Sequence, residues 1–132
     1  MQIVGVGTDI IECVRIRQLI ERHGEVFLTR VFTEREISYC QSRRNATEHF
    51  AGRFAAKEAI LKCLGTGMSK GLCWTEIEVR NEPNGQPKVT IHGATREITR
   101  RLKISDFLIS ISHCRSYATA YATAVASDDD EV

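Results

Sequence analysis

The sequence has no run of about 18 apolar residues, the length that a single helix needs to cross a membrane. Its first residues do not form a basic region followed by an apolar stretch, so we expect no signal peptide. The net charge is only +1, so the chain has no overall positive field that would attract nucleic acid or an anionic membrane. We therefore expect neither nucleic acid nor a membrane among its partners.

The sequence also lacks any Cys-x-x-Cys pair and any zinc-type spacing between its cysteines and its four histidines. The cysteines are odd in number and scattered along the chain, at Cys13, Cys40, Cys63, Cys73 and Cys114. Such a set is typical of a reduced, intracellular chain, because disulfide frameworks belong to oxidising compartments. We expect a cytoplasmic protein.

The length of 132 residues fits one domain with a sizeable core. Hydrophobic residues make up 42% of the chain and charged residues 27%, as in ordinary globular proteins. No repeat or linker divides the chain. We expect a single domain over residues 1–126 and a disordered acidic tail over residues 127–132, which contains four consecutive acids.

Hydrophobic periodicity and turn residues predict an α+β fold with a mostly antiparallel sheet packed with helices. Strands are predicted at Gln2–Ile10, Trp74–Arg80, Val89–Ile91, Phe107–His113 and Tyr117–Val125, and the turn residues at 82–87 suggest a hairpin. Helices are predicted at Glu12–His23, at Thr33–Gln41 after a capping box, and at Ala94–Lys103 with Ile98 and Leu102 inward. The first strand is predicted to be buried. Residues 26–32 are apolar, and the sequence does not decide whether they form a helix or a strand.

One face of the last predicted strand consists of alanine, from Ala118 to Ala126. Such a face allows close approach by a helix or by another subunit, and packing in the core is the commoner explanation.

The stretch Arg53–Gly67 has no proline, and its only glycines are at its end, so it predicts a strong helix. We expect this helix to begin near Thr47 and to end at Gly65. Helical spacing gives it one apolar stripe, formed by Phe50, Phe54, Leu61 and Leu64.

Glu58 falls inside this stripe, where a carboxylate is costly unless cations or hydrogen-bond donors stabilise it. Lys62 follows four residues later, and Arg53 and Lys57 lie on a flank of the same helix. The arrangement suits a site for a metal and phosphates. A salt bridge from Glu58 to Lys62 on an amphipathic helix is the simpler interpretation, and spacing alone favours it.

Asp9 is the best candidate for a second carboxylate, because it follows an apolar strand. Mg²⁺ prefers one or two carboxylates, together with water and substrate phosphates. Asp9 is equally plausible as the N-cap of the next helix. His113, at the end of another predicted strand, could contact a phosphate, although a lone histidine is more often structural.

Four motifs follow one another along the chain: Gly5–Glu12 with Arg15; Phe50–Ala59 with Lys62 and Leu64–Gly67; Gly85–Pro87; and Ser110–His113 with Tyr117 and Ala118. Together they resemble the motifs of the 4'-phosphopantetheinyl transferases of the short, single-domain type. Their order and spacing cover the chain from Met1 to about Val125, which makes the resemblance highly specific. Cys114 is a departure, because family members often have a carboxylate there.

The resemblance implies that coenzyme A donates 4'-phosphopantetheine to a serine of an acyl carrier protein, for fatty acid biosynthesis, and releases adenosine 3',5'-bisphosphate. It places Mg²⁺ on Asp9 and Glu58. Glu58, directly or through a metal-bound water, would help to remove the serine proton, and Lys62 would neutralise or protonate the leaving phosphate.

The resemblance also implies binding sites. Those for coenzyme A map to Arg53, Phe54, Lys62, Gly65, Thr66, Gln86, Pro87 and His113. Arg15 and Arg22, two turns apart on one helix face, would meet the acidic carrier protein. The family is usually a homotrimer with sites between subunits, which gives the alanine face, or the strands beside it, a possible interface role. A module that binds nucleotide or coenzyme A without catalysis remains a second hypothesis.

Overall fold

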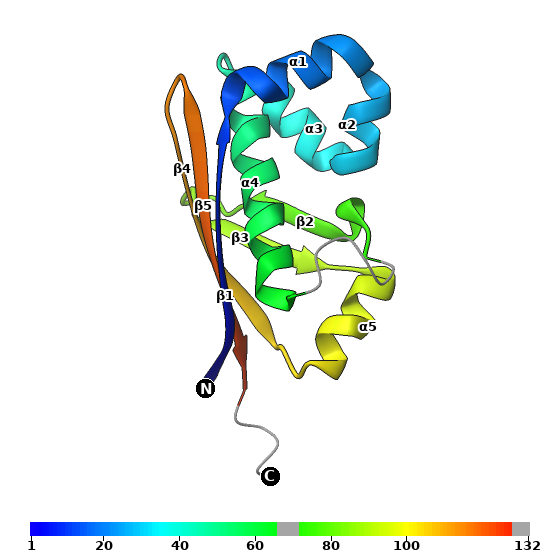
Figure 1. The fold of residues 1–132 in the computed structure, drawn as a ribbon, viewed down its shortest axis with the longest axis vertical. Coiled ribbons are helices and arrows are strands. Elements are labelled where there is room, and N and C mark those ends of the chain that lie inside the picture. The colour runs from blue at the N-terminus through cyan, green and yellow to red at the C-terminus, as the bar shows by residue number, and fades with distance from the viewer. Residues whose placement is uncertain (66–71, 128–132) are drawn as a thin grey trace.

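The computed structural model of the chain describes residues 1–65 and 72–127, and in these residues helices and a hairpin lie against one side of an antiparallel sheet (Figure 1). The elements are β1 (Gln2–Glu12), α1 (Cys13–His23), α2 (Glu25–Val31), α3 (Glu34–Gln41), α4 (Ala46–Leu64), a short 3₁₀ helix (Trp74–Glu76), β2 (Ile77–Asn81), β3 (Pro87–Ile91), α5 (Gly93–Arg101), β4 (Asp106–His113) and β5 (Tyr117–Ala126). The predicted α+β class is confirmed. The acidic residues 128–132 lie outside the described residues.

The main sheet has three strands in the order β1–β5–β4, and both neighbouring pairs are antiparallel. The predicted hairpin forms a second, two-stranded sheet of β2 and β3. None of the helices in the described residues is long and apolar enough to cross a membrane.

The face of β5 that carries alanine lies in the core. Ala118, Ala120, Ala122 and Ala124 are buried, and α4 packs across β5. Because alanine has the smallest side chain with a Cβ, this face lets α4 lie directly against β5. The core interpretation of this face is therefore confirmed, and α4 occupies the side that another subunit would have needed.

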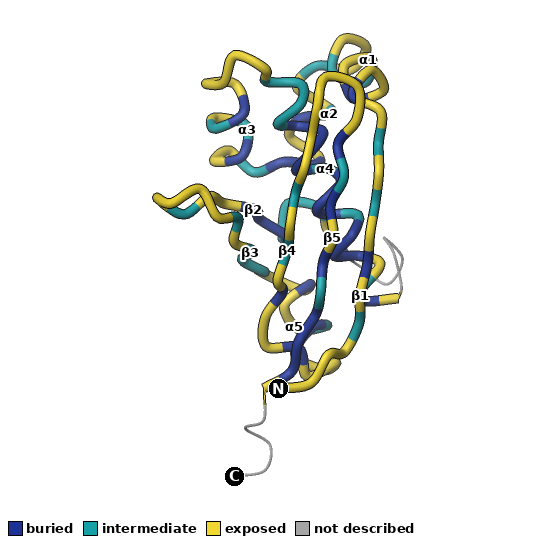
Figure 2. Tube along the Cα trace, turned by 90° about the vertical axis from the view of Figure 1, so that its left-hand side faces the viewer, coloured by how far each residue is buried: buried dark blue, intermediate teal, exposed yellow. Residues whose placement is uncertain are grey.

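The prediction of a buried first strand is wrong for one of its faces. Val6 and Ile10 of β1 are 54% and 63% exposed, on the side of the sheet away from α4. Leu108 of β4 and Tyr121 of β5 are 52% and 49% exposed on the same side. Figure 2 shows β1 and β4 as largely exposed strands on either side of the more buried β5. We call these four side chains the outer apolar face.

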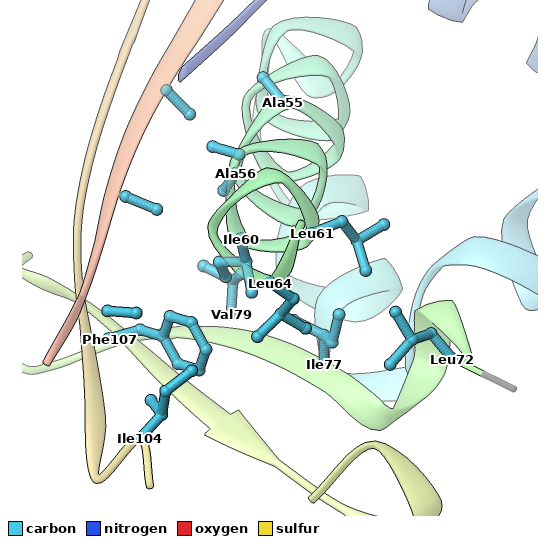
Figure 3. Packing of buried hydrophobic residues seen from close by; sticks show 14 residues of the cluster. Ala55, Ala56, Ile60, Leu61, Leu64, Leu72, Ile77, Val79, Ile104 and Phe107 are labelled. Atoms are coloured by element: carbon cyan, nitrogen blue, oxygen red, sulfur yellow. The ribbon is translucent and has the colours of Figure 1, made fainter. Parts of the chain in front are cut away.

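Helix α4 is the central element of the core. It starts at Ala46 after Asn45, one residue earlier than expected, and no side chain caps its first turn. Gly65 ends it in the left-handed region with φ 76°, as predicted. Leu64 packs with Ile77 of the hairpin and Phe107 of β4 in one buried cluster (Figure 3).

The remaining helices are close to expectation. The capping box of α3 is present, with Thr33 accepting from the backbone N–H of Glu36 at 3.2 Å. The uncertain segment is helix α2. In α5 the buried side chains are Thr95 and Thr99, whereas Leu102 is 42% exposed, so the predicted inward face was wrong at Leu102.

Candidate active site

Asp9, Glu58 and Lys62 meet at the edge of the sheet formed by β1. Strand β1 can approach α4 because Gly7 has no side chain; a Cβ at Gly7 would collide with the carbonyl oxygen of Ala59. This close approach brings Asp9 to the side of α4 that carries Glu58 and Lys62. We call these three residues the carboxylate group.

Lys62 pairs with Asp9. Its Nζ donates to Oδ1 of Asp9 at 3.2 Å and to the carbonyl oxygen of Thr8 at 2.9 Å. The Lys62 side chain is 54% exposed, so it is accessible to a ligand. Among the described contacts, its ion pair is therefore with β1, and the simple i,i+4 bridge to Glu58 is not the arrangement observed.

Glu58 is a half-buried acid in an unfavourable place for a negative charge. Burial raises the pKa of its carboxyl, and the nearby Asp9 carboxylate adds to the rise, whereas Lys62 opposes it. A cavity of about 550 Å³ opens beside it, lined also by Asp9, Arg15 and Phe54. A cation or a proton bound here would relieve the repulsion between the two carboxylates.

The donor set fits Mg²⁺. No cluster of three or more potential ligands from His, Cys, Asp and Glu occurs in residues 1–65 and 72–127. Two carboxylates are nevertheless enough for Mg²⁺, which completes its octahedral shell with water and substrate phosphates. Asp9 and Glu58 are the residues that would hold it.

Lys57 does not belong to the site. Its Nζ is fully buried and donates to Glu36 at 2.7 Å, to the carbonyl of Val31 at 2.6 Å and to that of Trp74 at 3.1 Å. Burial lowers the pKa of Lys57, and Glu36 opposes this change. All three of its N–H donors are used, so Lys57 joins elements of the core. Its predicted place on the flank of the site was wrong.

Arg53 and His113 meet at the other edge of the sheet. They line a small hollow of about 120 Å³ together with Pro87 of the hairpin, Asn81 and Tyr39. The Arg53 guanidinium stacks over the Tyr39 ring, 4.2 Å from its centroid, and donates to Oδ1 of Asn81. We call these five residues the arginine group.

Arg53 is a buried cation without an acidic partner among the described residues. The residue is only 4% exposed, and its Nε has no hydrogen-bond partner in that part of the chain. A buried guanidinium without a counter-charge is costly. The hollow is therefore suited to an anionic or strongly hydrogen-bonding group.

The two groups lie on opposite sides of α4. Gly7 of β1 contacts α4 at Ala59 and Lys62, whereas a Cβ on Gly52 of α4 would meet Ile111 and His113 of β4. The helix itself covers the alanine face of β5 between them. One subunit therefore presents two separate half-sites, one at each edge of its sheet.

The other predicted site residues do not gather in one place. Phe54 lines the cavity of the carboxylate group and stacks on Trp74 at 5.2 Å, so it is not in the arginine group. Gln86 is exposed, and it does not line the hollow, although its neighbours Gly85 and Pro87 do. Gly65 is exposed at the end of α4, and Thr66 lies outside the described residues.

Sequence reasoning missed Tyr39, Glu48, His49 and Asn81. They come from α3, α4 and β2, and no spacing in the sequence connects them with His113. Tyr39 and His49 are stacked edge to face at 5.7 Å, and His49 is 4.9 Å from His113. Only the periodicity of α4, which places Glu48, His49 and Gly52 on adjacent turns, could have indicated part of this cluster.

Comparison with known proteins identifies the class. The family model described as the 4'-phosphopantetheinyl transferase superfamily matches residues 5–125. The chain belongs to this superfamily.

Individual relatives agree with this assignment. The chain is 49% identical over 119 residues to a holo-[acyl-carrier-protein] synthase of Protochlamydia amoebophila, covering 90% of this chain and 95% of the relative. The fold of this chain is similar to the crystal structure of the holo-[acyl-carrier-protein] synthase of Neisseria meningitidis. The TM-score is 0.87 at 29% identity, and the match covers 94% of this chain and 99% of that one. The Helicobacter pylori enzyme in complex with coenzyme A is similar with a TM-score of 0.81, 30% identity, and coverage of 91% and 99%.

Proposed function

We propose that this protein transfers 4'-phosphopantetheine from coenzyme A to a serine of an acyl carrier protein, releases adenosine 3',5'-bisphosphate, and serves fatty acid biosynthesis in the cytoplasm. The observation that carries the proposal is the carboxylate group, in which two acids and a half-exposed lysine meet beside a cavity. A protein that only bound coenzyme A would have no need of this group.

In the proposed reaction the serine hydroxyl oxygen attacks the phosphorus next to the pantetheine arm. The bond from that phosphorus to the bridging oxygen of the pyrophosphate breaks. Glu58 takes the serine proton, directly or through a water, and its raised pKa makes it a stronger base than an ordinary carboxylate. Lys62 neutralises or protonates the phosphate that leaves.

The proposed cofactor is Mg²⁺, held by Asp9 and Glu58. When bound, it would neutralise charge on the pyrophosphate and help to orient it. The Asp9 carboxylate is paired with Lys62 at 3.2 Å. Excess EDTA should stop the reaction and added Mg²⁺ should restore it; full activity in EDTA would refute the metal assignment.

We propose a homotrimer, as the family resemblance implies, and the two half-sites support sites that are shared between subunits. The outer apolar face exposes Val6, Ile10, Leu108 and Tyr121, and exposed apolar faces of this kind mark interfaces between proteins. Burying it in a closed, cyclic assembly would bring the β1 edge of one subunit toward the β4 edge of the next. The carboxylate group of one chain and the arginine group of its neighbour would then form one complete site.

The mass of an acyl carrier protein tests the proposal. The apo form is incubated with this protein, coenzyme A and Mg²⁺, and its intact mass is then measured. We expect an increase by one phosphopantetheine group, and a much slower increase with the Glu58→Gln variant. Tight binding of coenzyme A without a mass change would favour the non-catalytic module.

A further inference from the structure

We propose that Glu48 is a positioning residue. It holds the His113 ring through Nδ1 so that Nε2 faces a phosphate at the nucleotide end of coenzyme A. This inference rests on the proposed function, because it assumes that the arginine group binds that end. Glu48 itself lies outside the hollow and would not touch the ligand there.

The geometry is specific. Oε1 of Glu48, in the first turn of α4, is 2.9 Å from Nδ1 of His113 at the end of β4. The two side chains are 22% and 26% exposed, so water only partly competes for this hydrogen bond. Asn45 donates from Nδ2 to the same oxygen at 3.3 Å, which holds the carboxylate in place.

The contact decides which nitrogen of His113 is available. A carboxylate only accepts hydrogen bonds, so Nδ1 must carry a proton and donate it to Glu48. Nε2 is then the nitrogen left for the ligand, and it donates to a phosphate oxygen in the doubly protonated ring, where both nitrogens carry a proton. Carboxylates in this arrangement fix the tautomer and the orientation of histidines that bind ligands through the other nitrogen.

A second contact restricts the ring, because His49 packs against it with ring centroids 4.9 Å apart. Gly52 lies nearby, where an added Cβ would come into ordinary van der Waals contact with Cδ2 at 3.8 Å. The hydrogen bond to His113 lowers the pKa of the Glu48 carboxyl, so the acceptor is ionised at neutral pH. Without Glu48, the polar contact that sets the rotation of the ring would be lost.

A structural role is the alternative, because an acid in the first turn stabilises a helix by itself. A double-mutant cycle separates the two roles. The variants are Glu48→Ala, His113→Ala and the double variant, with Glu48→Gln as the conservative change and Glu97→Ala on α5 as the matched control. The readouts are KM for coenzyme A, kcat, and the KM ratio between 3'-dephospho-coenzyme A and coenzyme A.

We expect Glu48→Ala to raise the KM for coenzyme A about tenfold, the size of one lost hydrogen bond to a charged group, with little change in kcat. In the His113→Ala background the same substitution should have no further effect on KM. Glu48→Gln still offers an oxygen to Nδ1 and should remain close to the parent, as should Glu97→Ala.

Two results for Glu48→Ala would overturn the inference. One is an unchanged KM in Glu48→Ala; the other is an increase of equal size in both backgrounds. If Glu48→Ala does not fold, Glu48→Asp gives the same test, because it retracts the carboxylate by one methylene group. If His113→Ala itself leaves both the KM for coenzyme A and the KM ratio unchanged while transfer proceeds, the nucleotide assignment fails, and the inference fails with it.

Discussion

Nζ of Lys62 on α4 lies 3.2 Å from Oδ1 of Asp9 on β1, although the two residues are 53 positions apart in the sequence. This contact has two consequences for a phosphate-transfer site. It aligns a carboxylate that is proposed to bind a cation, and it keeps an ammonium group close to where negative charge would develop.

The first prediction concerns Lys62. Lys62→Ala should lower kcat by about 10²-fold or more. It removes the ammonium charge that would stabilise the leaving phosphate, and it removes the contact that aligns Asp9. The KM for coenzyme A should change less. Steady-state kinetics checks this, with Arg101→Ala on the exposed side of α5 as control. A raised KM with an unchanged kcat would make Lys62 a binding residue only.

Much of the fold was predictable because it depends on local signals. The α3 capping box and the Gly65 terminus are set by residues within a few positions of each other, and both are present. The outer face of β1 was not predictable. Alternation cannot distinguish a strand buried on both sides from one whose apolar side is exposed in a single subunit.

The candidate site was predictable in part. The order of the motifs indicated Asp9, Glu58 and Lys62, and the structure brings these three together. It could not show that Lys57, one position before Glu58, points into the core, because the partner Glu36 comes from another helix. The separation of the two half-sites also follows only from the packing of α4 on β5.

The second prediction concerns Glu58 and pH. Its pKa is raised in the folded state, so between the unfolded and folded pKa values the folded chain binds more protons. The free energy of unfolding of the parent should therefore fall as the pH rises through this window. Glu58→Gln lacks this fall, so its stability relative to the parent should be greater at pH 8 than at pH 4.

Urea unfolding at the two pH values measures this difference, with Glu97→Gln as a control for an exposed acid. The Glu58→Gln variant should also lose more than about 10²-fold in transfer rate, because it removes the proposed base and metal ligand. A relative stability that does not depend on pH would contradict the raised pKa as a property of the folded chain.

The third prediction concerns assembly. If each site combines two subunits, an Asp9→Ala chain mixed with an Arg53→Gln chain should regain activity. Random mixing in a cyclic trimer gives one intact site in about four. The pair Asp9→Ala and Lys62→Ala should regain nothing, because these residues belong to one half-site of the same chain.

Activity is measured after the chains are mixed in denaturant and refolded together, and the molar mass in solution is determined on the same samples. A parent protein that stays fully active as a monomer at low concentration would contradict the composite site. So would equal recovery in both mixtures.

The last prediction concerns the docking of the carrier protein. The net charge of +1 provides no global attraction for an acidic partner, so the attraction must be local. Arg15 is exposed on α1 and lines the same cavity as Asp9 and Glu58. Arg22 is exposed two turns further along the same face. A carrier held by this face would present its serine near the carboxylate group.

Arg15→Glu should raise the KM for the carrier protein, mainly through a slower association rate, and should make it less sensitive to salt. The KM for coenzyme A should change much less, since its nucleotide end is proposed to be held by the arginine group, to which Arg15 does not belong. Arg22→Glu should act in the same direction, and Arg101→Glu on α5 should have no effect. Both KM values are measured at low and high salt. If Arg15→Glu keeps the parental carrier KM and salt dependence, the carrier docks on another face.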